Sequence, residues 1–565
     1  MADNQNLVDV LVVGAGPVGL IFAYQLARLE GVSVRIIEKK VKSMQDAYGR
    51  AITLFPRTVE MLSQLGLADA LMKEAFLCRK NVTYNSRGEE VQGRGWSFMS
   101  KMTDTAFDFV LVLRQKYQEE IYRNALSRHG VHVESPVELI GIDIDESAPW
   151  DTYRVTARVL HTETGVTEMI RCKYLIGADG GHSTVRRVLD IPFEGSSSED
   201  RWVRIDGIVK SDMPKPDSYC SIESPTHGNV LWVGLDHGAT RIGYALTDNR
   251  TNPYPEFDEQ AAVKEATAAV KPFTLEFERV DWWTIYTVGQ RIAKHFSVHN
   301  CVFLVGDAAH THSSGAAQGL NAGIHDAVNL GWKLYLVLRG QVQPKLLRTY
   351  EMERRPVIQR LLQYDADISR LMTNRLPENW QGDPSADVNE VLGAIMDEAG
   401  SFNSGLGISY PPLLGNPLVS TMDVVNPSIT LRAGMRAPDT TLIPCITNDQ
   451  VKLLRAMTNE GRFQIIVFGK ERSTDDTNLT HIRGWPRTVL CKYFFDMYGA
   501  SGYRRYGIDF ARGGVVVVRP DGWISALFPL NKDTGDELDK HFETIGFIPR
   551  SNEDGETTKN GNGGG

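Results

Sequence analysis

The chain has 565 residues, which is enough for two to four domains and a large buried core. Hydrophobic residues make up 42% and charged residues 23%, and no run of 18 apolar residues occurs, so the composition excludes a mainly disordered chain and indicates no membrane span. The net charge of -9, without a strongly basic stripe, argues against nucleic acid as a partner.

The first forty residues predict a strand, a tight turn, a helix and a second strand, which together form a βαβ unit. The turn reads Gly14-Ala15-Gly16-Pro17-Val18-Gly19. In a dinucleotide-binding turn the first glycine makes the bend, the second lets a pyrophosphate approach the backbone, and the third lets the helix pack closely. Glu38 ends the second strand, where a ribose-binding acid belongs, and an acid there disfavours a 2′-phosphate. No second fingerprint of this kind occurs, so a nicotinamide cofactor would bind without a Rossmann domain of its own.

The segment "LIGADGGHST", residues 175–184, places a carboxylate, Asp179, among glycines at the end of an apolar strand. One interpretation makes Asp179 and Gly180 part of a cofactor site. The other makes Asp179 a cap of the turn before "HSTVRR". Both can hold together.

Residues 200–290 alternate between apolar and polar side chains, which predicts an antiparallel sheet with "WVRIDGIV", "NVLWVGL" and "TRIGYAL" as strands. Alternation places Trp202, Arg204 and Asp206 on one face. Arg204 could stabilise a phenolate, and Trp232 or Tyr244 could contact an aromatic ring. A structural role on the sheet remains the alternative for each.

Residues 301–334 return to the first pattern, with a strand that ends at Gly306-Asp307 and a long helix that begins near Gly319. Asp307 could accept a hydrogen bond from a polyol chain. The helix start at Gly319 to Asn321 could set positive potential beside a negatively charged ring. His310 and His312 suggest a metal, but further ligands are missing, so we predict none.

Residues 375–430 are rich in Pro, Gly and Asn and are interpreted as a linker, and about 431–550 form a smaller unit with a hairpin turning at Pro520-Asp521-Gly522. The six cysteines lie far apart without a CxxC pair, which disfavours zinc and dithiol chemistry and suggests a reducing compartment. We therefore expect a cytoplasmic protein. The glycine-rich tail after residue 550 is expected to be disordered.

Three motifs taken together, GAGPVG, the ADG segment, and GDAAH with the following QGLN, resemble the group A flavoprotein monooxygenases of the para-hydroxybenzoate hydroxylase superfamily. "LLRTYEMERRPV", residues 346–357, resembles a further segment of that family, and the C-terminal unit resembles the thioredoxin-like domain of the phenol hydroxylase branch. The resemblance implies an α/β fold: a Rossmann-like FAD-binding domain, an interleaved antiparallel substrate domain, and a C-terminal thioredoxin-like domain.

The domain boundaries expected from this reading are given by eight segments. They are 1–80, 111–198 and 291–375 for FAD binding; 81–110 and 199–290 for the substrate sheet; 376–430 for a linker with helices; 431–550 for the thioredoxin-like domain; and 551–565 for the tail.

The resemblance implies a monooxygenase that takes FAD as cofactor, NADPH or NADH as co-substrate and O2, and hydroxylates a phenolic or polyketide-like small aromatic molecule through a flavin C4a-hydroperoxide. A homodimer is expected, with no membrane or nucleic acid as partner. The cofactor residues it implies are Gly14, Gly16, Pro17, Gly19, Glu38, Lys39, Arg50, Gln115, Asp179, Gly180, Asp307, Gly319, Leu320 and Asn321. Arg204, Asp206 and Tyr244 are the candidate catalytic residues, and Trp232 and Tyr244 the candidate substrate contacts.

Two positions depart from the family pattern. Ser314 replaces a proline that lines the oxygen-reaction pocket, and Ile52 replaces the aspartate that serves as a candidate base in phenol hydroxylase. These departures leave room for a flavin-binding sensor or electron-transfer protein without oxygenation. Separately, the same scaffold could perform epoxidation or Baeyer–Villiger oxygen insertion on a polyketide-like substrate.

Overall fold

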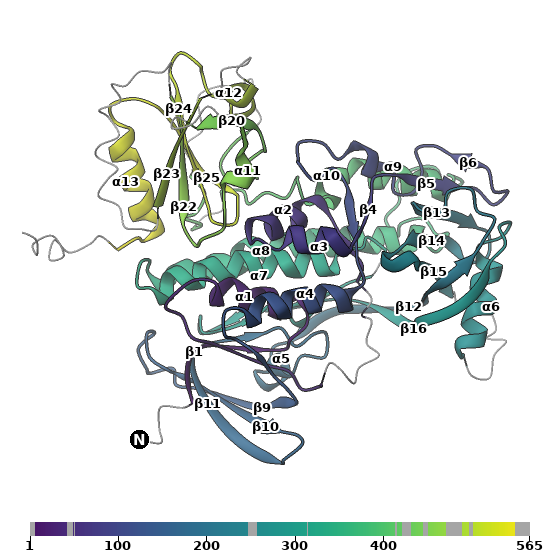
Figure 1. Cartoon of the computed structure of the whole chain (residues 1–565), viewed down its shortest axis with the longest axis horizontal. Coiled ribbons are helices and arrows are strands. Elements are labelled where there is room, and N and C mark those ends of the chain that lie inside the picture. Colours follow the sequence, from purple (N-terminus) through teal and green to yellow (C-terminus); the bar gives the residue numbers. More distant parts are fainter. Residues whose placement is uncertain are drawn as a thin grey trace, which may run out of the picture.

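The computed structural model describes residues 6–41, 49, 51–246, 257–313, 315–412, 415–420, 431–444, 450–469, 489–495 and 501–548. Figure 1 shows a lower parallel sheet, a second sheet at its side, and a C-terminal unit above two long helices. The fold is mixed α/β, as the sequence predicts. Arg50, Ser314 and the tail fall outside the described residues.

The first sheet has parallel strands at its centre, and acidic residues follow three of these strands. Its order is β17-β18-β11-β1-β2-β8, and β10 and β9 extend it from β11. The strands are β1 (Leu7–Val13), β2 (Val34–Ile37), β8 (Val133–Glu134), β9 (Val137–Ile144), β10 (Val155–His161), β11 (Val166–Gly177), β17 (Ser297–Val298) and β18 (Val302–Leu304). Chain direction and pairing bring the carboxyl ends of β2, β1, β11 and β18 to one edge. Ligands of open α/β sheets bind outside such an edge.

Helices cover this sheet and connect it to the rest of the molecule. α1 (Pro17–Ala27) is apolar on every side and packs between the sheet, α4 (Gln115–Ser127) and α7 (Gly319–Leu338). α8 (Thr349–Leu371) runs along α7 (Figure 1). The shorter helices are α2 (Pro56–Gln64), α3 (Ala68–Glu74), α5 (Thr184–Val188), α9 (Val388–Glu398) and α10 (Gly400–Asn403), and a small sheet joins β3 (Thr53–Leu54), β7 (Val110–Val112) and β4 (Phe76–Cys78).

The second sheet has the order β19-β16-β12-β15-β14-β13-β5-β6 and is largely antiparallel. Its strands are β5 (Asn81–Tyr84), β6 (Glu90–Val91), β12 (Phe193–Lys210), β13 (Tyr219–Ser224), β14 (Gly228–Gly234), β15 (Thr240–Leu246), β16 (Glu276–Ala293) and β19 (His310–Thr311). α6 (Glu259–Ala269) closes an apolar core against one face. The opposite face of this sheet is directed toward the parallel sheet. Segments of this sheet interrupt those of the first sheet along the chain. The segment boundaries given above stay a prediction.

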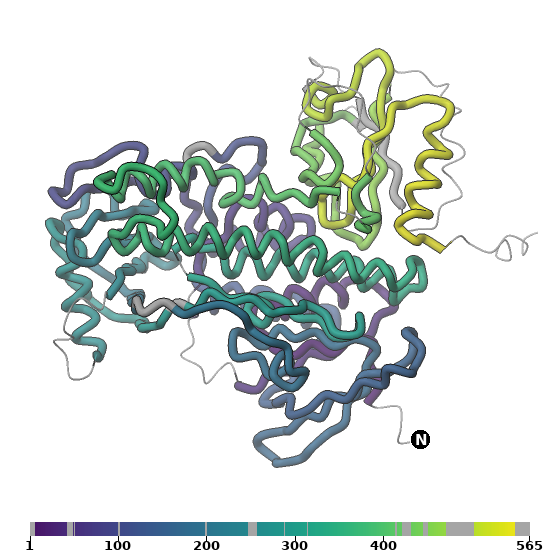
Figure 2. The backbone as a smooth tube through the Cα atoms, turned by 180° about the vertical axis from the view of Figure 1, so that it is seen from behind, coloured from purple at the N-terminus to yellow at the C-terminus, as the bar shows by residue number. Residues whose placement is uncertain are grey.

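The C-terminal unit is built on a third sheet, β21-β20-β23-β22-β24-β25, whose parallel β22–β23 pair and β24–β25 hairpin suit a thioredoxin-like fold. The elements are β20 (Thr441–Pro444), β21 (Val451–Lys452), β22 (Phe463–Phe468), β23 (Val489–Phe495), β24 (Gly514–Val518), β25 (Ile524–Pro529), α11 (Leu453–Ala456), α12 (Ser501–Tyr506) and α13 (Thr534–Ile545). Figure 2 shows this unit from behind, standing against the long helices.

Buried charges join the C-terminal unit to α7 and α8. The guanidinium of Arg519 donates to both oxygens of Glu353 at 2.6 and 2.9 Å, and to both oxygens of Asp521 at 2.9 and 2.6 Å. Lys333 Nζ donates to Glu353 at 2.8 Å. The four side chains, here called the Arg519 cluster, are at most 1% exposed, and their two positive and two negative charges balance. Paired charges of this kind are tolerated in a core because each is hydrogen-bonded.

Candidate active site

A cavity of about 750 Å³ lies between the carboxyl edge of the parallel sheet and the inner face of the antiparallel sheet. Its size is within the range of small-molecule and cofactor sites. Among the described residues that line it, four are arginines (Arg186, Arg204, Arg241 and Arg291) and one, Asp307, is a carboxylate. The cavity is therefore suited to anionic ligands.

The glycine turn forms one end of the cavity. Gly14 has φ +104°, and a Cβ there would lie 2.4 Å from the Ala178 carbonyl oxygen. A Cβ on Gly19 would lie 2.0 Å from the Gly14 carbonyl oxygen, so that glycine is required by packing. A Cβ on Gly16, by contrast, would meet nothing within 4 Å and would project into open space. Because α1 begins with Pro17 and without a side-chain cap, its first-turn N–H groups are left for an anion.

Acids follow three of the four parallel strands that end at this edge, namely β2, β11 and β18. Glu38 follows β2 and accepts a hydrogen bond from the Ala15 N–H at 2.9 Å, which fixes it beside the glycine turn. Asp307 follows β18, is exposed to the cavity and has no hydrogen-bond partner among the described residues. Lys39 is exposed and does not line the cavity.

Asp179 follows β11 and caps a helix. Its Oδ2 accepts hydrogen bonds from the Thr184 and Val185 N–H groups, at 2.7 and 3.0 Å, at the start of α5. Its Oδ1 is buried and has no partner among the described residues. Gly180 lines the cavity at φ +78°. The capping interpretation thus accounts for one oxygen of Asp179, while the other is buried without a partner and Asp179 itself does not line the cavity.

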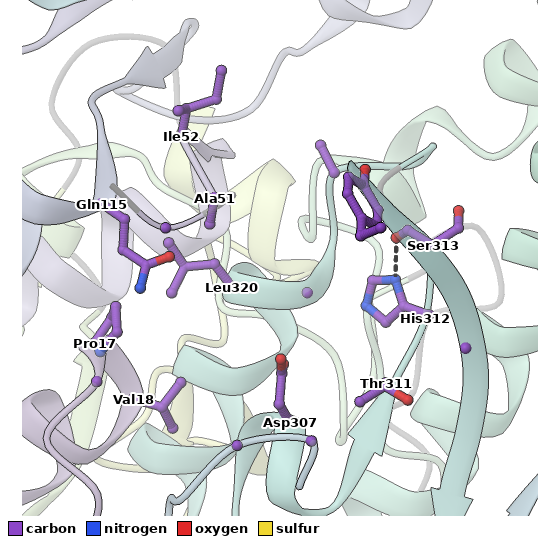
Figure 3. Close-up of a pocket in the computed structure, with 18 of the residues that line it drawn as sticks. Pro17, Val18, Ala51, Ile52, Gln115, Asp307, Thr311, His312, Ser313 and Leu320 are labelled. Carbon is purple, nitrogen blue, oxygen red and sulfur yellow. Dashed lines mark hydrogen bonds between the residues drawn. The ribbon is translucent and has the colours of Figure 1, made fainter. Parts of the chain in front are cut away.

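Figure 3 shows the middle of the cavity, where Gln115, Leu320, Asp307 and His312 point inward. Gln115 begins α4, and its amide donates to Glu119 at 2.9 Å. Gly319 and Leu320 line the cavity at the start of α7, which has no side-chain cap. The polar side chains of this part of the cavity provide hydrogen-bond donors and acceptors that an extended polyol chain could use.

Asn321 is predicted to lie by a flavin ring, but the structure uses its amide elsewhere. Its Oδ1 accepts from the Phe55 N–H at 2.9 Å and from the Thr58 hydroxyl at 2.7 Å. Its Nδ2 donates to the carbonyls of Thr53 and Ala317, each at 3.0 Å. Asn321 therefore fastens the start of α7 to the β3–α2 segment and does not line the cavity.

Two arginines occupy the face of the antiparallel sheet that closes the cavity. Asp206 binds Arg241 through two hydrogen bonds, at 2.6 and 2.8 Å, and both side chains are buried. Arg204 lies opposite Gly243, where a Cβ would come within 2.4 Å of its guanidinium, so glycine makes the room. Burial lowers the pKa of Arg204 from its ordinary value, yet a guanidinium remains charged at neutral pH.

Tyr219 and Ile52 complete this end of the cavity. The Tyr219 hydroxyl lies 3.5 Å from the Thr53 hydroxyl, and burial raises the pKa of Tyr219 to about 12, so it stays protonated and can donate. Ile52 lines the cavity at the position where phenol hydroxylase has an aspartate, so the wall there is apolar. Arg241 and Tyr219 were not predicted from the sequence.

Trp232 and Tyr244, expected to contact the substrate, are corrected by the structure, because both lie on the opposite face of the sheet. Tyr244 pairs with Val203, is fully buried, and donates to the Ala262 carbonyl of α6 at 2.8 Å. The Trp232 indole donates to the Pro216 carbonyl at 3.1 Å within the same core. Alternation along one strand cannot reveal which face meets a cofactor.

The two histidines that suggest a metal in the sequence are His310 and His312. Among the described residues, no group of three potential ligands could hold a metal ion. His310 is held by Asp326 at 2.7 Å in the core and does not line the cavity. In the same described ranges, no helix is long and apolar enough to cross a membrane.

Two family models and a curated relative match large parts of the chain. A family model described as FAD binding domain matches residues 7–365, and one described as phenol hydroxylase, C-terminal dimerisation domain, matches residues 483–549. A phenol 2-monooxygenase of Aspergillus fumigatus is 28% identical, with 98% of each chain covered.

Two solved structures share the fold of this chain. The OxyS anhydrotetracycline hydroxylase from Streptomyces rimosus superposes with a TM-score of 0.74 at 25% identity, covering 96% of this chain and 100% of that one. An aklavinone-11 hydroxylase, solved as a ternary complex with FAD and aklavinone, gives a TM-score of 0.74 at 24% identity, covering 96% and 99%. The latter likeness concerns the fold.

Proposed function

From the premise that the chain belongs to the FAD-binding domain family and is an FAD-dependent monooxygenase, we propose that it hydroxylates a phenolic or polyketide-like aromatic compound. The observation that carries this proposal is the single cavity that joins a dinucleotide-binding turn to a buried pair of arginines. FAD, when bound and reduced by NADPH or NADH, supplies the chemistry that activates O2.

The residues of the cavity fit FAD in order. Open space at Gly16 and the uncapped start of α1 suit the pyrophosphate, and Glu38 is placed for a ribose hydroxyl. Asp307 is free to accept from the ribityl chain, and the start of α7 at Gly319 would set positive potential beside the ring. Asp179 contributes by fixing the loop at Gly180, which lines the cavity.

The arginine pair would act on the substrate. We assign Arg204 and Arg241 to bind an oxygen substituent of the aromatic ring and to stabilise its negative charge, because a phenolate is more nucleophilic than a phenol. Asp206 orients Arg241 through its two hydrogen bonds. Tyr219 stays protonated and serves as a donor rather than a base. The cavity wall at Ile52 offers no carboxylate, so charge stabilisation by arginine replaces deprotonation by an aspartate.

The test follows NAD(P)H oxidation in air by the FAD-loaded protein with a panel of phenols and polyketide aromatics, using 18O2. Substrate-stimulated oxidation with one labelled oxygen on the ring supports the proposal. A labelled epoxide or lactone would assign the alternative oxygen insertions. NAD(P)H oxidation without any oxygenated product across the panel would contradict it.

Matched variants test the arginine. Arg204→Met removes hydrogen bonds to a charged group and is expected to lower kcat/KM by about 10- to 150-fold, since such bonds contribute roughly 1.5–3 kcal/mol. Tyr244→Phe is the control, because Tyr244 lies on the far face of the same sheet. It should change kcat/KM less than about threefold, roughly 0.7 kcal/mol, because the hydrogen bond that it removes, to the Ala262 carbonyl, lies outside the cavity. Equal effects of the two variants would refute the assignment.

We also propose that the chain forms a homodimer through its C-terminal unit, which the matched family model describes as a dimerisation domain. Light scattering on the full chain tests this. A mass near twice 63.0 kDa is expected, and a monomer at micromolar concentration would contradict it.

A further inference from the structure

A buried histidine of the cavity has no part in the function proposed so far. The side chain of His312 is 1% exposed and lies in the loop between β19 and α7. Its Nδ1 is 2.8 Å from the Ser313 carbonyl oxygen and 3.8 Å from Asp365 Oδ1. A carbonyl only accepts, so Nδ1 carries a hydrogen. The free nitrogen of the ring is then Nε2.

His312 lines the cavity, and its Nε2 is buried and has no hydrogen-bond partner among the described residues. A Cβ on Gly319 would lie 3.6 Å from Nε2, so the ring rests against the start of α7. Figure 3 shows His312 on the inner wall with Asp307 and Leu320. A buried nitrogen without a partner is costly to leave unsatisfied, which indicates that a ligand completes it.

Asp365 of α8 fixes the ring and its charge. It accepts from the Ser313 N–H at 2.7 Å, the Ser313 hydroxyl at 2.6 Å and the Gln290 amide at 2.8 Å. These bonds and His312 outweigh burial and lower the pKa of Asp365, so the carboxylate stays ionised.

The charge of His312 follows from the groups around it. Burial alone lowers the pKa of His312, but Asp365, the Ser313 carbonyl and the nearby Asp307 outweigh burial, and the net pKa is above its ordinary value. Four arginines line the same cavity, and their positive charge acts on His312 in the opposite sense to the charge of those carboxylates; they are Arg186, Arg204, Arg241 and Arg291. His312 can therefore hold a proton near neutral pH.

The reaction needs such a proton. The overall balance is NAD(P)H + H⁺ + O2 + ArH → NAD(P)⁺ + ArOH + H2O, so one proton is consumed in each turnover. The cavity arginines are too basic to give it, and Tyr219 keeps its proton up to about pH 12. A second histidine, His182, also lines the cavity, but it is exposed, whereas His312 is buried and held at Nδ1. We propose that His312, held at Nδ1 by the Ser313 carbonyl and Asp365, delivers this proton through Nε2 to the FAD-occupied cavity and is reprotonated from solvent. This rests on the proposed function.

The first experiment reads the imidazole directly. Apoprotein and FAD-loaded protein carry 13C at histidine Cε1, and the signal missing in His312→Gln identifies His312. We expect its titration midpoint to lie above the ordinary value of about 6.5, to shift when FAD is loaded, and to rise again when the flavin is reduced anaerobically to its anion. Asp365→Asn should lower the midpoint. No histidine signal of the wild-type protein responding to FAD would overturn the proposal, whether or not the variant folds.

The second experiment reads the pH profile of product formation. Wild-type kcat should fall as pH rises through the His312 midpoint, and His312→Gln should lower kcat by about 100-fold and remove that limb. His132→Gln, an exposed histidine before β8, is the control and should match the wild type. An unchanged profile in an FAD-loaded His312→Gln protein would overturn the proposal. Failure of the wild-type protein to bind FAD would instead strike at the proposed function.

Discussion

Replacing Arg519 by methionine tests how the C-terminal unit is held to the FAD-binding domain. Arg519 makes four hydrogen bonds to Glu353 and Asp521, and all three side chains are buried. Without the charge of Arg519, Lys333 is the one positive group of the cluster against two carboxylates, so one negative charge is in excess. Removing one partner of a buried ion pair costs about 3–5 kcal/mol.

A second argument sets the size of the loss. The excess carboxylate can escape by taking a proton. For a glutamate with an ordinary pKa of about 4.3 this costs roughly 3.7 kcal/mol at pH 7 and about 1 kcal/mol at pH 5. In the variant the folded state then binds one proton more than the unfolded state, so its stability rises as pH falls. We expect Arg519→Met to lose about 3–4 kcal/mol at pH 7 and roughly 1–2 kcal/mol at pH 5.

Urea denaturation at the two pH values measures the free energy of unfolding. The control is Arg519→Met combined with Asp521→Asn, which restores the charge balance and should recover most of the loss at pH 7 with little dependence on pH. A loss below about 1 kcal/mol for the single variant at pH 7, or an equal loss at both pH values, would refute the reasoning.

Three further predictions concern other parts of the chain. Gly19→Ala should lower the stability of the apoprotein by about 1–3 kcal/mol because its Cβ would overlap the turn, whereas Gly16→Ala should leave the apoprotein Tm unchanged and weaken FAD binding, measured by flavin fluorescence. Asp206→Asn should raise KM for the aromatic substrate about tenfold by releasing Arg241, with FAD content, read from the flavin spectrum, unaltered. Burial lowers the pKa of His541 to about 4, so between pH 6.5 and 4 this histidine is protonated in the unfolded state but not in the folded state. The free energy of unfolding should therefore fall by roughly 3 kcal/mol as the pH is lowered across that window. His541→Gln should remove most of this loss, measured by thermal scans at pH 7 and 4.5.

The parts of the site that the sequence predicts are those set by local rules. Gly16, Glu38 and Asp307 each follow a strand of the parallel sheet, and strand ends of one direction meet at one edge, so a strand–turn pattern places them near the ligand. Asn321 sits in the expected helix start, yet its amide is used by partners more than 260 residues away, which a local pattern cannot anticipate.

The parts that the sequence does not predict depend on register between strands. Alternation placed Arg204 and Asp206 on one face, but the pairing of β12 with β15 decides that Arg241 and Gly243 share that face and Tyr244 does not. The sequence offers one signal for this arrangement, Gly243 between Arg241 and Ala245, because a glycine inside a strand often marks the close approach of another group. The Arg519 cluster joins residues from three separate segments, so no local pattern in the sequence predicts it.

The order of strands in the parallel sheet has a consequence for the synthesis of the chain. β1 is made first and finds β2 at once, but its other edge is completed by β11, and β18 joins after residue 302 has been added. The cavity needs Leu320 as well. At about 5–20 residues per second, the open edge of β1 waits roughly 7 to 28 seconds for the end of β11, and the cavity waits roughly 15 to 60 seconds for Leu320 before FAD can bind.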